Sequence, residues 1–149
     1  MVAGADQLEP MRAVTEALAL CQAADAIPVP DRMAILARGL RRAEEAVTAN
    51  PQYAAAHFAV FCNLGKRAQL RRQEIGLFGI LDDLGRARRE IDDTLELDPN
   101  YAPALAAKGQ MLMELPRLLG GDPEEGERLL RRAVTLEPAL ARSLVHGSR

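Results

Sequence analysis

The chain has 149 residues and a formal net charge of −2; hydrophobic residues make up 48% of it but aromatic residues only 3%, with no Trp. A core of this composition must be built from Ala, Leu, Val and Ile, which suits closely packed helices and disfavours an all-β fold. The charge gives no basic field for nucleic acid, and no apolar run approaches the roughly 20 residues that cross a bilayer, so we expect neither nucleic-acid binding nor membrane insertion.

The first helix is predicted over about residues 6–24, where apolar residues recur three or four apart along one face. Residues 25–30 contain two prolines and predict a loop. A second helix is expected over about 31–49, with Leu36, Leu40 and Ala43 facing inward. These two helices make the first predicted hairpin, 6–49.

A second hairpin is predicted over 52–97. Its first helix starts near Gln52 and runs to about Arg72, and the glycines at 76 and 79 indicate a turn before the next helix. The third hairpin is predicted over 102–137, where Asp122 followed by Pro123 and two glutamates is typical of a helix N-terminus. A short capping helix over about 139–146 is expected to cover the apolar end of the hairpins.

Small residues stand at fixed distances before the proline that ends each predicted hairpin. Five residues before Pro51, Pro99 and Pro138 stand Ala46, Thr94 and Ala133, and twelve before them stand Gly39, Ala87 and Gly126. Small side chains let two helices approach closely, and proline cannot continue a helix. The sequence therefore predicts a repeated helical hairpin.

This pattern resembles the tetratricopeptide repeat (TPR). The match is best after Pro99, where Leu105, Lys108, Gly109 and Leu112 occupy the signature places of the first helix, whereas Phe61 replaces the expected glycine after Pro51. The spacings between the prolines also exceed the period of the ideal repeat. The resemblance implies an all-α, right-handed stack of three antiparallel hairpins plus the capping helix, as a single domain over residues 1–149.

In TPR stacks the first helix of each hairpin lines a concave groove. Carrying the groove positions over by resemblance predicts partner binding by Phe58, Cys62, Lys66 and Gln69 from one hairpin, and by Gln110, Met113 and Arg117 from the next. The implied function is a non-enzymatic scaffold that binds a peptide or protein of unknown identity, with homo-oligomers possible. The alternative is that Phe58 and Met113 only pack against an added helix.

A second, narrower resemblance implies a different function. The turn at 115–126 and the stretch at 56–61 are similar to the TPR proteins associated with periplasmic substrate-binding transporters, the T component of TRAP systems. This resemblance implies an accessory subunit of a solute transport system or a small-ligand carrier. A cavity between hairpins would favour that function, whereas an open polar groove would favour peptide binding.

Catalytic and metal chemistry find little support in the sequence. The two histidines are His57, at a packing position of the repeat, and His146, near the C-terminus, so we expect neither to bind a metal. The acidic pair Asp92-Asp93 is expected to be solvated surface, and Gly120-Gly121 a turn and not a phosphate loop. We therefore predict no enzyme activity, no cofactor and no metal site.

The two cysteines and the N-terminal residues are the features of the sequence that relate to the cellular compartment of the protein. Cys21 and Cys62 are too few for a disulfide framework and fall on different predicted helices, so both are expected as small buried hydrophobic residues. Residues 1–10 lack the basic start and apolar run of a signal peptide, so the cytoplasm is the default location. A periplasmic location stays open if a leader has been removed.

Overall fold

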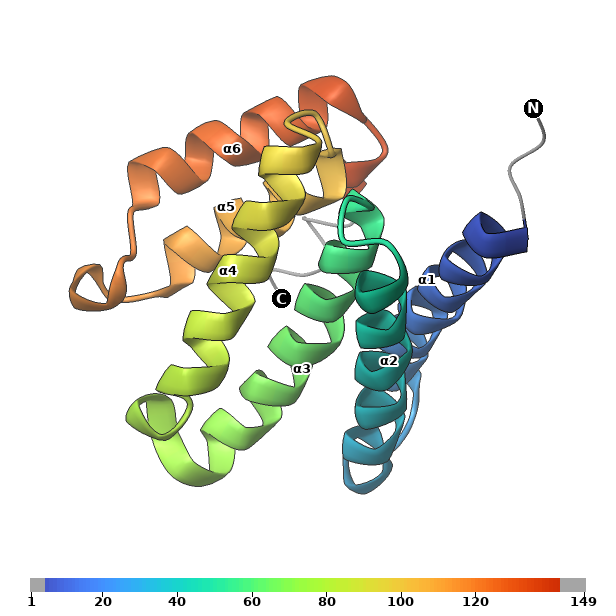
Figure 1. The fold of residues 1–149 in the computed structure, drawn as a ribbon. Coiled ribbons are helices and arrows are strands. Elements are labelled where there is room, and N and C mark those ends of the chain that lie inside the picture. Colours follow the sequence, from blue (N-terminus) through green and yellow to red (C-terminus); the bar gives the residue numbers. More distant parts are fainter. Residues whose placement is uncertain (1–4, 143–149) are drawn as a thin grey trace. The chain divides into compact units, whose positions relative to one another are not determined.

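The computed structural model describes residues 5–142, and within that range it contains helices, turns and loops but no strand (Figure 1). The all-α prediction is confirmed. The helices are α1 (Ala5–Ala23), α2 (Val29–Ala49), α3 (Ala54–Gly79), α4 (Leu81–Leu97), α5 (Ala102–Glu114) and α6 (Pro123–Leu136), with short 3₁₀ turns η1 (Ala24–Ala26) and η2 (Arg117–Leu119). None of the described helices has both the length and the apolar character that crossing a membrane requires.

The chain divides into two compact units, Met1–Leu97 and Asp98–Arg149. The first unit contains α1 to α4 and the second contains α5 and α6. A single domain over residues 1–149 stays a prediction. Residues 140–142 are helical, as expected for the start of the predicted capping helix, and the rest of that helix lies outside the described residues.

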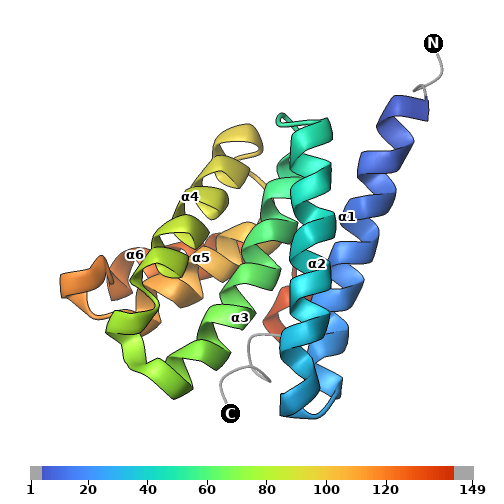
Figure 2. The same cartoon turned by 60° about the horizontal axis from the view of Figure 1, so that its bottom comes forward.

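In the first unit each helix packs on its neighbour in sequence (Figure 2). Helix α3 also packs on α1. The core between them is built mostly from small residues, since alanine side chains let the helix backbones approach closely. Its fully buried members come from all four helices: Ala13, Val14, Ala17, Leu40, Ala43, Ala46, Ala56, Ala59, Val60, Leu64 and Ala87. The low aromatic content of the sequence thus corresponds to a core made of Ala, Val and Leu.

The turn between α3 and α4 depends on one glycine. Gly76 has φ 78° and ψ 173°, a conformation that L side chains rarely adopt, and it interrupts α3 before the chain enters α4. The turn expected from the two glycines is thus present, although helical geometry continues beyond Arg72, where we predicted the helix to end.

In the second unit α5 and α6 come close together at two glycines, Gly109 and Gly126. A Cβ built on Gly109 would lie 2.7 Å from the carbonyl oxygen of Gly126, and one built on Gly126 would lie 2.7 Å from that of Gly109. The N-terminus of α6 is capped as predicted, because Asp122 Oδ1 accepts a hydrogen bond from the backbone N–H of Glu125 at 3.2 Å. Gly109 and Gly126 belong to the repeat pattern, and Asp122 was predicted separately as the start of this helix.

Candidate functional site

The groove residues predicted on α3 largely contact other parts of the first unit. Phe58 is buried, and its ring stacks on that of Phe61 with centroids 6.1 Å apart. Cys62 forms a disulfide with Cys21 of α1, with the two Cα atoms 6.3 Å apart. The expectation that the cysteines are separate buried hydrophobic residues was therefore wrong. It failed because a count of two cysteines gives no information about which helices lie side by side.

Two further α3 side chains bind the backbone of α1. Asn63 Nδ2 donates to the carbonyl oxygen of Ala17 at 3.1 Å, and Lys66 Nζ donates to that of Cys21 at 2.7 Å and to Asp25 Oδ2 at 2.8 Å. A lysine at this position satisfies a carbonyl that the last turn of a helix leaves without a partner. We call Cys62, Asn63 and Lys66 the α1–α3 clasp.

The other predicted groove residues are exposed. Gln69 lies on the outer part of α3, and Gln110 and Met113 lie on α5, where the Met113 residue is 47% exposed. Arg117, in η2, is also exposed and forms an ion pair with Glu124 at 3.2 Å. Partner binding by these residues stays a prediction.

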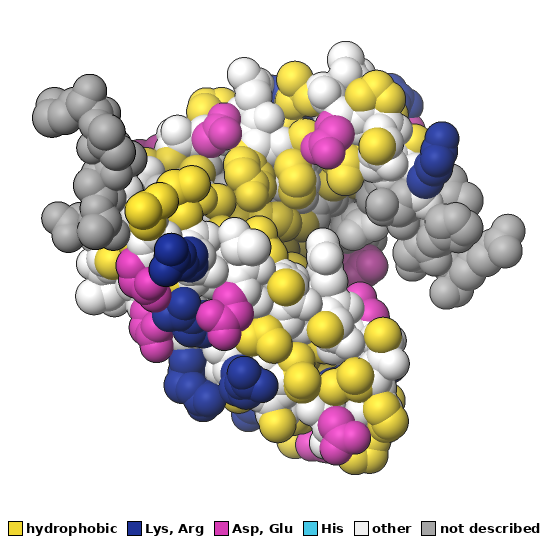
Figure 3. All heavy atoms as spheres, turned by 90° about the vertical axis from the view of Figure 1, so that its right-hand side faces the viewer, with side chains coloured by type: hydrophobic (Ala, Val, Ile, Leu, Met, Phe, Trp, Pro, Cys, Tyr) yellow, Lys and Arg dark blue, Asp and Glu magenta, His cyan; other side chains and the backbone are white. Residues whose placement is uncertain are grey.

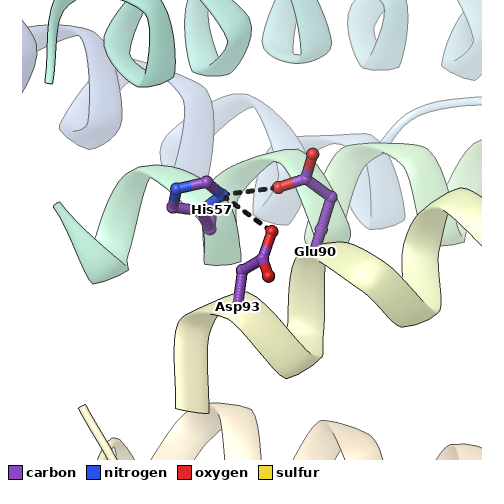
Figure 4. Close-up of side chains that lie close together, drawn as sticks. All are labelled: His57, Glu90 and Asp93. Atoms are coloured by element: carbon purple, nitrogen blue, oxygen red, sulfur yellow. Dashed lines mark hydrogen bonds and ion pairs between the residues drawn. The ribbon is translucent and has the colours of Figure 1, made fainter. Parts of the chain in front are cut away.

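A polar cluster that we did not predict joins α3 to α4 (Figure 4). His57 lies near the start of α3, and Glu90 and Asp93 project towards its imidazole from α4. The distance from His57 Nδ1 to Glu90 Oε2 is 2.8 Å and that to Asp93 Oδ2 is 4.0 Å. On the other side of the ring, Nε2 lies 2.8 Å from the carbonyl oxygen of Pro51.

The hydrogen bonds determine how His57 is protonated. A carbonyl oxygen can only accept, so Nε2 must carry the hydrogen that bonds Pro51, and Nδ1 is left facing the two carboxylates. Burial of the ring opposes its charge, but the Pro51 carbonyl and the carboxylates of Glu90 and Asp93 together raise the pKa of His57 above its ordinary value. The two carboxylates therefore favour a proton on Nδ1.

His57, Glu90 and Asp93 also have the chemistry of metal ligands. One ligand atom from each lies within 4.8 Å of the other two. Sequence reasoning placed His57 at a packing position and Asp93 in a solvated acidic pair, and it missed their proximity because His57 and Glu90 are 33 residues apart. The available signal was the Glu-x-x-Asp spacing, which puts both carboxylates on one face of the helix that pairs with α3.

The face of the molecule that carries α1 exposes hydrophobic side chains among charged ones (Figure 3). A hollow of about 450 Å³ lies along α1 and is lined by Leu8, Met11, Arg12, Thr15, Glu16 and Ala19. All of the described residues that line the hollow belong to α1.

Comparison with known proteins does not assign a family, because no family model, curated protein or solved structure matches the chain.

Proposed function

We propose that the chain is a non-enzymatic protein-interaction module of the TPR type, a right-handed stack of three helical hairpins with a C-terminal capping helix. The observation that carries the proposal is the contact between Gly109 and Gly126, where a Cβ on either residue would meet the backbone of the other helix. These are the small residues that the TPR-like pattern places in the first and second helices of a hairpin. Backbone contact at such positions is what the pattern requires.

We place the partner-binding surface on α5, at Gln110 and Met113, and extend it to Arg117. An amide, a flexible thioether and a guanidinium, all exposed, suit a peptide held by one apolar anchor and a few hydrogen bonds. We leave Phe58, Cys62 and Lys66 out of this surface, since Phe58 is buried and the other two hold α1. Gln69 is exposed on α3 and stays a candidate.

A photo-crosslinking amino acid in place of Met113 tests the proposal. In an extract of the source cells, we expect this variant to form a discrete crosslinked product that contains a second protein. The matched control carries the same amino acid in place of Arg131, an exposed residue of α6. If both positions give the same products, or if neither gives any, α5 is not a partner-binding surface.

The alternative function, a small-ligand carrier or transport accessory, receives no specific support from the hollow along α1. The described lining belongs to one helix, whereas a carrier needs a site that encloses most of its ligand.

A further inference from the structure

We propose that His57, Glu90 and Asp93 form a binding site for a divalent transition-metal ion, of which Zn²⁺ fits best. The site would join α3 to α4 within the first unit, and it is separate from the peptide surface proposed on α5. The proposal starts from the convergence of one imidazole and two carboxylates, whose ligand atoms lie within 4.8 Å of one another.

Small side-chain movements would bring the three residues to coordination distances. Zn²⁺ lies about 2.0–2.2 Å from histidine nitrogen and carboxylate oxygen, so two ligands of a tetrahedral ion are about 3.4 Å apart. The distance from His57 Nδ1 to Glu90 Oε2, 2.8 Å, would have to lengthen by about 0.6 Å, and the 4.0 Å distance to Asp93 Oδ2 would have to shorten by about as much. The carboxylate oxygens of Glu90 and Asp93 lie within 4.8 Å of each other and would also have to approach. All three residues have rotatable side-chain bonds through which such changes can be made.

The imidazole is already held in the orientation that a metal ligand needs. A metal-bound histidine usually donates its second ring N–H to a carbonyl or carboxylate, which fixes both the tautomer and the ring plane. Here Nε2 donates to the carbonyl oxygen of Pro51 at 2.8 Å, so Nδ1 points at Glu90 and Asp93. An incoming ion would replace the hydrogen on Nδ1 and leave the bond to Pro51 in place.

The charges of the cluster also favour a cation. Two carboxylates face one imidazole, and no Lys or Arg within the described part of the chain forms an ion pair with either of them. If His57 is protonated, its positive charge balances only one of the two carboxylates, so the cluster keeps a net charge of about −1. The side chains of His57 and Glu90 are only 10% and 17% exposed, so water screens this charge poorly. A divalent ion bound to neutral His57 would balance both carboxylates.

Access and ligand type narrow the choice of ion. The Asp93 side chain is 53% exposed, which gives the ion a route from solvent and leaves room for water in the fourth position. Mg²⁺ and Ca²⁺ prefer sites made only of oxygen atoms, whereas imidazole together with carboxylate suits Zn²⁺ and its spectroscopic substitute Co²⁺.

Titration of the chelator-treated full chain with Co²⁺, followed by competition with Zn²⁺, tests the site. We expect visible d–d absorption that saturates at one ion per chain and disappears when Zn²⁺ is added. The variants His57→Gln and Asp93→Asn should each bind at least tenfold more weakly. His146→Gln removes the other histidine, which lies outside the described residues, and should bind like the wild type.

Circular dichroism of each variant separates loss of the site from loss of the fold. Asp93→Asn changes a half-exposed side chain and gives a decisive result even if His57→Gln does not fold. The proposal is overturned if the wild type gives no saturable Co²⁺ spectrum, or if folded Asp93→Asn binds Co²⁺ as tightly as the wild type.

Discussion

At the scale of single residues, the contact between Asn63 and Gly39 shows how a polar group is accommodated in an alanine-rich core. Asn63 is fully buried, and its Nδ2 donates to the carbonyl oxygens of Ala17 and Ala59, while Oδ1 has no hydrogen-bond partner. A Cβ on Gly39 would lie 2.0 Å from that Oδ1. The amide therefore fits only because residue 39 lacks a side chain.

Substituting this glycine should be costly. We expect Gly39→Ala to lower the free energy of unfolding by about 1–3 kcal/mol, because Asn63 must move from a position where it makes two hydrogen bonds. Urea denaturation followed by circular dichroism measures the change. Gly65→Ala is the matched control, since a Cβ there meets nothing within 4 Å and alanine favours the helix by about 0.5–1 kcal/mol. If both substitutions change the free energy of unfolding equally, the contact between residue 39 and Asn63 does not limit the size of the side chain at residue 39.

At the scale of elements, the α1–α3 clasp attaches α1 through side chains that all come from one stretch of α3. The disulfide from Cys62 joins residues 41 apart in sequence, so it restricts a long loop of the unfolded chain. Loop-closure entropy of this length corresponds to about 4 kcal/mol. The clasp therefore couples the stability of the first unit to the redox state of its cysteines.

Reduction of the disulfide should be measurable as a loss of stability. We expect a reductant to lower the free energy of unfolding by up to about 4 kcal/mol, as measured by urea denaturation with and without the reductant. The Cys21→Ala/Cys62→Ala variant is the control and should not respond to reductant. Two titratable thiols in the denatured protein before any reduction would show that the bond does not form.

At the scale of the whole molecule, the two compact units differ in how much core each can build. The buried cluster formed by α1 to α4 lies entirely within residues 1–97. The described part of the second unit has two main helices, α5 and α6, and its buried apolar side chains are mostly alanines and leucines. The two helices come close together at Gly109 and Gly126, which contribute no side chain to a core. We expect a two-helix unit of this size to bury too little apolar surface to offset its loss of conformational entropy.

Separate expression of the two units tests this difference. We expect residues 1–97 to unfold cooperatively on heating, and residues 98–149 to show little helix on their own, as followed by circular dichroism. The full chain serves as the reference for both. A cooperative transition in the 98–149 fragment alone would mean that its core is larger than its buried residues indicate.

The sequence predicted those parts of the molecule that depend on local signals. Helices α2, α4 and α6 begin and end close to their predicted residues because prolines, the Asp122 cap and regular apolar spacing fix them. The end of α3 was less accurate, since a glycine with positive φ interrupts the helix without changing the apolar pattern. The disulfide and the His57 cluster were missed because each joins residues that lie more than 30 positions apart.

The clasp also determines how the chain would carry a mechanical load. If the two ends of the oxidised chain were pulled apart, tension would pass from Cys21 to Cys62 through the sulfur atoms, and the segment between them would not be stretched. That segment contains all of α2 and the first turns of α3. Just over a quarter of the polypeptide is therefore shielded from force, and only reduction of the disulfide would add this length to the extensible chain.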